Sequence, residues 1–249
     1  MRGLFNYDGP VFTALNKLTD LIILNLLFIV CCIPIFTIGA SCTAMAYVTQ
    51  KQKDGREGYI WKSFFHSFKQ NFFQATIIWM CMLALAVFML IDMQIVKNMA
   101  GNSAAVLKIF LIAGAVIWFM IFNVVFPLLA KFDNKTLATV KNAALIAVAN
   151  APKTILLCAA WVAAVFITAW NTQTIATLSL VWLLIGFAAM SVLNTHLFYP
   201  IFLKLIPEEL REDADTDGLS ELDLDTAAED SEADAQAAED VFDYTKLRN

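Results

Sequence analysis

Long runs of residues without a single charge constrain this chain more than any other feature. Such runs cover residues 21–50, 70–91, 109–130 and 154–203. A helix needs about 20 apolar residues to cross the hydrocarbon core of a bilayer, which is about 30 Å thick. The last run is long enough for two crossings, with the polar residues 171–174 as the turn between them. These runs therefore predict a membrane protein with four spans after residue 69.

The composition leads to the same class of protein. Hydrophobic residues make up 59% of the chain and charged residues 16%, against roughly 45–50% and 25% in ordinary soluble domains. A chain of 249 residues has too little interior to hide so much apolar surface from water. The composition excludes a soluble globular domain, and we expect an all-α, polytopic helical membrane protein.

The net charge of −5 combines two unlike segments. Residues 207–249 contain sixteen acidic and three basic residues, whereas residues 1–206 contain six acidic and fourteen basic ones. The acidic segment has too few apolar side chains to fold alone. We therefore expect a helical transmembrane domain over residues 1–206 and a disordered acidic tail over residues 207–249.

Pro34 interrupts the first apolar run. Proline removes a helix hydrogen bond and clashes with the preceding turn, and Thr37 and Gly39 follow it closely. A helix bend is therefore expected at Pro34, Thr37 and Gly39. One interpretation is a single kinked span, which gives five spans in all. The other is a hairpin of two helices, which gives six.

The Lys and Arg content of the loops predicts the orientation, because basic residues concentrate on the cytoplasmic side. The loops 51–69, 92–108 and 131–153 carry five, two and four of them, the turn 171–174 carries none, and the segment after residue 203 carries four. The first, the third and the last are therefore expected in the cytoplasm, together with the C-terminus. The same rule favours the hairpin at Pro34. The six expected spans are about 11–33, 38–53, 70–92, 108–130, 153–170 and 175–203.

Two segments of the basic loops have amphipathic patterns. Aromatic residues recur at helical spacing opposite Lys62, His66 and Lys69. The aromatic residues are Trp61, Phe64, Phe65, Phe68, Phe72 and Phe73. Residues 136–150 repeat the pattern more weakly. Both patterns predict amphipathic helices on the cytoplasmic side, at the lipid interface.

The residue types that catalysis or metal binding requires are scattered. His66 and His196 have no cysteine or carboxylate neighbours at ligand spacing, and all five cysteines lie in apolar runs. The chain contains no phosphate-binding loop, no G-x-S-x-G and no H-E-x-x-H motif. We therefore expect no enzyme activity, no catalytic residue, no metal site and no cofactor.

The span centres contain amide and imidazole groups but no Asp, Glu, Lys or Arg, which weighs against an ion-coupled pump. These polar residues are Asn25, Asn123, Asn194 and His196. Such groups cost several kcal/mol when they face hydrocarbon, so they are expected to face the interior of the helix bundle. There they either join helices by hydrogen bonds or line a polar ligand pocket.

Several short motifs point to a known family. They are Phe5-Asn6 with Asp8, Leu-Asn-Leu-Leu at 24–27, Pro-x-x-Thr-x-Gly-Ala at 34–40 and Phe-Lys-Gln-Asn-Phe at 68–72. Together they resemble YesL-type bacterial integral membrane proteins over roughly residues 1–205. That family is a domain of unknown function without assigned catalytic residues. Its members are often encoded beside carbohydrate-uptake and sensor-kinase genes, so the resemblance implies an accessory role near sugar import or sensing.

The chain is thus predicted to be a non-enzymatic accessory protein that crosses the bacterial cell membrane several times. The expected partners are the lipid bilayer and a carbohydrate transporter or sensor kinase, and no nucleic acid. The alternative is a small-solute transporter or channel with an interior polar pocket at Asn25, Asn123, Asn194 and His196. The sequence leaves the oligomeric state open.

Overall fold

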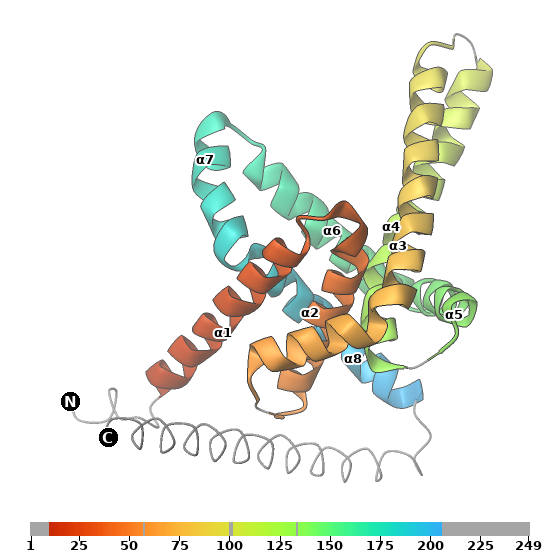
Figure 1. Ribbon diagram of the computed structural model, residues 1–249. Helices are drawn as coiled ribbons and strands as arrows, with labels where there is room; N and C mark the ends of the chain where they lie inside the picture. The colour runs from red at the N-terminus through yellow and green to blue at the C-terminus, as the bar shows by residue number, and fades with distance from the viewer. Residues whose placement is uncertain (1–9, 57, 100–101, 133, 206–249) are drawn as a thin grey trace, which may run out of the picture. The chain divides into compact units, whose positions relative to one another are not determined.

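The computed structural model describes residues 10–56, 58–99, 102–132 and 134–205. These residues form helices and no strand, which confirms the all-α class (Figure 1). The elements are α1 (Pro10–Cys31), η1 (Ile35–Thr37), α2 (Ile38–Lys53), α3 (Ile60–Lys97), α4 (Asn102–Lys131), α5 (Thr136–Ala149), α6 (Ala151–Thr168), α7 (Thr172–Val181), η2 (Trp182–Gly186) and α8 (Phe187–Leu205). The predicted tail at 207–249 and the motif at residues 5–8 lie outside the described residues. All packing described below lies within one compact unit that ends at Phe202.

Four helical stretches of the described residues are long and apolar enough to cross a membrane. They are Ile60–Lys97, Ala104–Lys131, Ala151–Thr168 and Thr172–Leu205. Each contains most or all of one predicted span, namely 70–92, 108–130, 153–170 or 175–203. The fourth stretch joins α7, the π-helical segment η2 and α8. These helices indicate a multi-pass membrane protein, whereas the total of five or six spans stays a prediction.

The chain breaks its helix at Pro34. α1 ends at Cys31, and α2 begins at Ile38 after the short 3₁₀ turn η1. Pro34 has extended backbone angles, with φ −75° and ψ 120°, which no α-helix accommodates. The chain reverses here, so that α2 leads back from the end of α1 (Figure 1). Pro34 therefore separates two helices, and α2 covers the same residues, 38–53, as the second arm of the predicted hairpin.

The first predicted amphipathic segment is not a separate helix. It forms the beginning of α3, which continues without a break from Ile60 to Lys97. Neither glycine nor proline occurs between these residues, so nothing in the sequence ends the helix between the segment and the span. In Figure 1 the orange first part of α3 and its yellow second part run in different directions.

The aromatic residues of that segment do not all face lipid. Phe64 is fully buried, and Phe68 and Phe72 pack against buried core residues. Phe73 is 81% exposed, and Trp61 and Phe65 are exposed as well. The prediction of a single lipid-facing aromatic surface is therefore wrong for part of the set, because α2 lies against α3 and covers its inner side.

The second amphipathic segment is a helix of its own, α5. It ends at Ala149, and α6 begins two residues later with a proline in its first turn. Pro152 lacks the N–H that a continuing helix would need, but the first turn of a new helix does not require one. Proline therefore separates α5 from α6, whereas its absence lets α3 run on.

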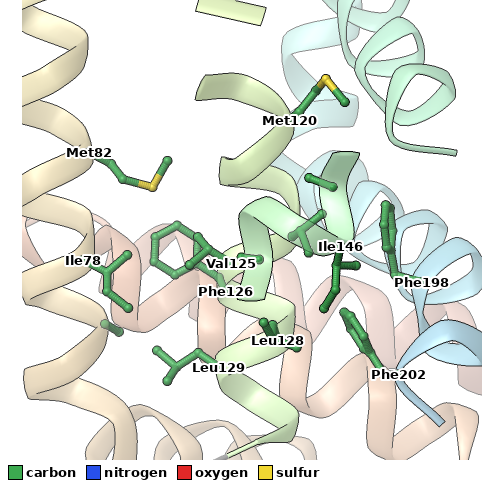
Figure 2. Close-up of a cluster of buried hydrophobic side chains, with 14 of the residues drawn as sticks. Ile78, Met82, Met120, Val125, Phe126, Leu128, Leu129, Ile146, Phe198 and Phe202 are labelled. Atoms are coloured by element: carbon green, nitrogen blue, oxygen red, sulfur yellow. The ribbon is translucent and has the colours of Figure 1, made fainter. Parts of the chain in front are cut away.

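Two clusters of buried apolar side chains hold the helices together. The larger one joins α3, α4, α5 and α8, with one buried residue each from α2 and α6, and Figure 2 shows its central members. They include Ile78 and Met82 from α3, Val125, Phe126, Leu128 and Leu129 from α4, Ile146 from α5, and Phe198 and Phe202 from α8. The second cluster joins α1, α2 and the start of α3, with Leu24, Phe28, Met45, Val48 and Phe64 at its centre. The helices are also joined by hydrogen bonds and ion pairs between polar side chains.

Candidate functional site

Asn25 joins α1 to the π-helical segment η2. Its side-chain Nδ2 donates to the carbonyl oxygens of Trp182 and Leu183, at 3.0 and 2.7 Å. The backbone N–H of Ala188 donates to Asn25 Oδ1 at 2.9 Å. A π-helical turn shifts the backbone hydrogen bonds by one residue, and the fully buried Asn25 amide binds backbone groups on both sides of that shift. Both the amide nitrogen and the amide oxygen of Asn25 are therefore hydrogen-bonded to backbone groups of the protein.

Asn194 of α8 binds a carbonyl that a proline has released. Pro127 lies inside α4 and has no N–H to offer the carbonyl of Asn123, four residues earlier. Asn194 Nδ2 donates to this carbonyl at 2.6 Å. The Asn123 side chain turns to its own helix and donates to the Phe119 carbonyl at 2.8 Å. The structure therefore brings together two of the predicted site residues, Asn123 and Asn194.

A second buried amide, Gln50 of α2, continues this arrangement one turn along α4. Its Nε2 donates to the Pro127 carbonyl at 2.9 Å. Beside it, Thr49 Oγ1 lies 2.8 Å from Thr195 Oγ1 and 3.2 Å from Ser191 Oγ, so hydroxyls connect α2 with α8. We call this set of residues, to which Asn123 contributes its backbone carbonyl, the polar seam. It consists of Thr49, Gln50, Asn123, Ser191, Asn194 and Thr195.

Charged side chains close the polar seam where α2 and α4 end. Asp54 accepts a hydrogen bond from the Tyr199 hydroxyl and lies 3.6 Å from Lys131 Nζ and 3.7 Å from Arg56 Nη2. Lys131 Nζ also donates to Tyr199 Oη at 3.1 Å. Tyr199 follows Thr195 by one helical turn, just as Lys131 follows Pro127 and Asp54 follows Gln50. The seam thus continues along one face of three helices into an ion-pair network.

His196 belongs to the edge of this network. Its side chain is exposed, and Lys53 Nζ donates to its Nδ1 at 2.8 Å. An ammonium group only donates, so His196 Nδ1 is the acceptor in this contact. The structure therefore places His196 at the surface, and Asn25 binds η2 rather than the polar seam. Of the four predicted polar residues, Asn123 and Asn194 are joined by a hydrogen bond, whereas Asn25 and His196 bond to other residues.

The bend residues hold the hairpin against α3. Thr37 Oγ1 lies 2.6 Å from the carbonyl oxygens of both Cys31 and Pro34. Its hydroxyl is therefore placed to donate to a carbonyl at the end of α1. Trp79 Nε1 of α3 donates to the Ile35 carbonyl at 2.7 Å. At Gly39 an added Cβ would lie 2.5 Å from the Ala75 carbonyl oxygen and 2.6 Å from Trp79 Cβ. Because Gly39 has no side chain, the backbone of α2 can approach the backbone of α3 closely at this point.

Sequence reasoning missed Gln50 and Thr49. They stand at the end of the first charge-free run, directly before Lys51, so they read as the boundary of a span rather than as interior residues. The available signal was helical spacing. Gln50 lies four residues before Asp54 and Thr49 four residues before Lys53, which puts each pair on one face of the helix.

The chemistry of the site is hydrogen bonding. Within the described part of the chain no three His, Cys, Asp or Glu residues are grouped so that they could hold a metal ion. The polar seam offers hydrogen-bond donors and acceptors from its amides, its hydroxyls and the released carbonyl. Charged groups lie at its end.

Comparison with known families agrees with the bend motif. Residues 21–93 match the family model described as "Protein of unknown function, DUF624". This segment is therefore similar to that family. The DUF624 match confirms the YesL-type resemblance over less than a third of the chain. It contains Asn25, the Pro34 bend and Gln50, whereas α4 and α8 lie beyond it. No curated protein and no solved structure matches the chain.

Proposed function

We propose that this multi-pass membrane protein is a non-enzymatic accessory protein that acts by binding another membrane protein. The observation that carries the proposal is the use of the buried amides. Asn25, Gln50 and Asn194 each donate to backbone carbonyls of another helix, at 2.6 to 3.0 Å. Amides used in this way join helices. A solute could bind to these amide N–H groups only by breaking their hydrogen bonds to the carbonyls.

The proposed partner is a carbohydrate transporter or its sensor kinase in the bacterial cell membrane. The YesL-type resemblance supports this choice, since members of that family are often encoded beside such genes. The loop charges support a cytoplasmic C-terminus, which leaves the acidic residues 207–249 on the side where a kinase or a transporter ATPase would be met.

Affinity capture tests the proposal. The full chain, tagged after Asn249, is purified from its native membrane in mild detergent, and co-purifying proteins are quantified by mass spectrometry. A transporter or sensor kinase should be enriched over a capture with the tag alone. A matched variant that lacks residues 212–249 shows whether the acidic segment contributes to capture. Recovery of lipid and the tagged chain alone would contradict the proposal.

A small-solute transporter or channel is the second candidate. The observation that favours it is the pair of buried oxygens Gln50 Oε1 and Asn194 Oδ1, which no donor among the described residues reaches. Proteoliposomes that contain only this protein distinguish the candidates. Solute flux above that of empty liposomes, lost in Asn194→Leu, would favour the transporter, and unchanged permeability favours the accessory protein.

A further inference from the structure

Two acceptor oxygens of the polar seam have no donor among the residues that the structure describes. Gln50 is 3% exposed and Asn194 9%. Their amide nitrogens donate to the carbonyls of Pro127 and Asn123, which fixes the orientation of both amide groups. No donor from the described residues lies within hydrogen-bond distance of Gln50 Oε1 or Asn194 Oδ1. Leaving such groups unsatisfied costs about 1–3 kcal/mol each, so a further donor to either oxygen would be stabilising.

The two amides bind consecutive turns of α4. Their nitrogens donate to the carbonyls of Pro127 and Asn123, which are one helical turn apart, about 6 Å along the axis. The neighbouring residues Thr49 and Thr195 bring their hydroxyls to 2.8 Å of each other, and Ser191 adds a third hydroxyl at 3.2 Å from Thr49. The two residues that carry the free acceptors, Gln50 and Asn194, are thus the direct chain neighbours of Thr49 and Thr195, whose hydroxyls meet between α2 and α8.

The charges around the seam restrict the ligand. An anion would bring further acceptors to oxygens that already lack donors. A cation would meet Lys53, Arg56 and Lys131 at the end of the seam, where Arg56 and Lys131 contact Asp54 and Lys53 contacts His196. Transfer of an ion into such a buried site costs several kcal/mol more than transfer of a neutral group. A neutral molecule with O–H groups satisfies both the acceptors and the hydroxyls.

We propose that the polar seam binds a neutral hydroxyl ligand, water or a small polyol, which donates to Gln50 Oε1 and Asn194 Oδ1. This inference goes beyond the accessory function and does not depend on the identity of a partner.

Cysteine labelling tests whether the seam is hydrated. Thr195→Cys and, one turn away, Ser191→Cys are compared with Leu193→Cys, on a different face of α8 and 37% exposed. The full-length variants are treated in proteoliposomes with iodoacetamide, and modification of each site is followed by peptide mass spectrometry. Alkylation requires the thiolate, which forms only where water is present, so both seam sites should react at least about tenfold faster than Leu193→Cys. The Ser191→Cys variant keeps the test valid if Thr195→Cys does not fold.

Two further measurements identify the ligand and the residue that holds it. Glycerol should slow labelling at the seam but not at Leu193→Cys if a polyol binds, whereas fast labelling without protection identifies water. Addition of Gln50→Leu to Ser191→Cys should slow labelling several-fold, because one of the two acceptors is removed. Seam sites that react no faster than Leu193→Cys, or that do not respond to Gln50→Leu, would overturn the proposal.

Discussion

At the scale of single residues, Gly39 sets how closely α2 approaches α3. Gly39→Ala would place a methyl group 2.5 Å from a backbone oxygen and 2.6 Å from Trp79 Cβ. Neither atom is the end of a flexible side chain, so we expect a loss of about 1–3 kcal/mol of stability, measured as a lower melting temperature in detergent. Gly114→Ala is the control, because its added Cβ meets only the flexible end of Met89. Equal melting temperatures for the two variants would contradict this account.

The Asn25 side chain provides a second prediction at the same scale. Asn25→Ala removes three hydrogen bonds to the backbone around η2. At about 0.6 kcal/mol per bond between membrane helices, the expected loss is about 2 kcal/mol. The variant should melt earlier than Asn142→Ala, which changes an exposed asparagine of α5. No difference between the two variants would show that Asn25 does not hold α1 to η2.

At the scale of elements, the proline in α4 determines what α8 can bind. Pro127→Ala restores an N–H that can bond to the Asn123 carbonyl within the helix, and the Asn194 amide then competes for this acceptor. In a double-mutant cycle, Asn194→Ala should therefore cost less stability in the Pro127→Ala background than in the native chain. Thermal unfolding of the four proteins in detergent measures the coupling. Additive effects would mean that the released carbonyl does not matter to α8.

At the scale of the whole molecule, the loop charges predict the side of each loop. A reporter fused after Asn249 should read cytoplasmic, and one inserted between Gly101 and Asn102 should read extracytoplasmic. The opposite pair of results would reject the assignment of the loops. A tag at residue 1 tests the number of spans separately. A cytoplasmic tag is expected from six spans, whereas an external tag would require five.

The sequence by itself determined the class of this protein and most of its helices. Charge-free runs longer than a bilayer crossing permit only buried or lipid-embedded helices, and prolines act locally, so the breaks at Pro34 and before α6 could be read from the residues. The absence of glycine and proline from 60–97 was equally visible, although the aromatic pattern suggested a separate interfacial helix.

Tertiary structure decided which polar groups meet. The side chains of Asn25, Asn194 and His196 could not be assigned partners from spacing, because their contacts join residues as far apart as 163, 71 and 143 positions in the chain. Asn25 bonds to the backbone at a π-helical turn, and no sequence pattern here announces that turn. Gln50 became an interior residue only because α2 packs between α3 and α4. Helix formation depends on neighbours in the chain, whereas satisfaction of a buried polar group depends on the helix that lies opposite.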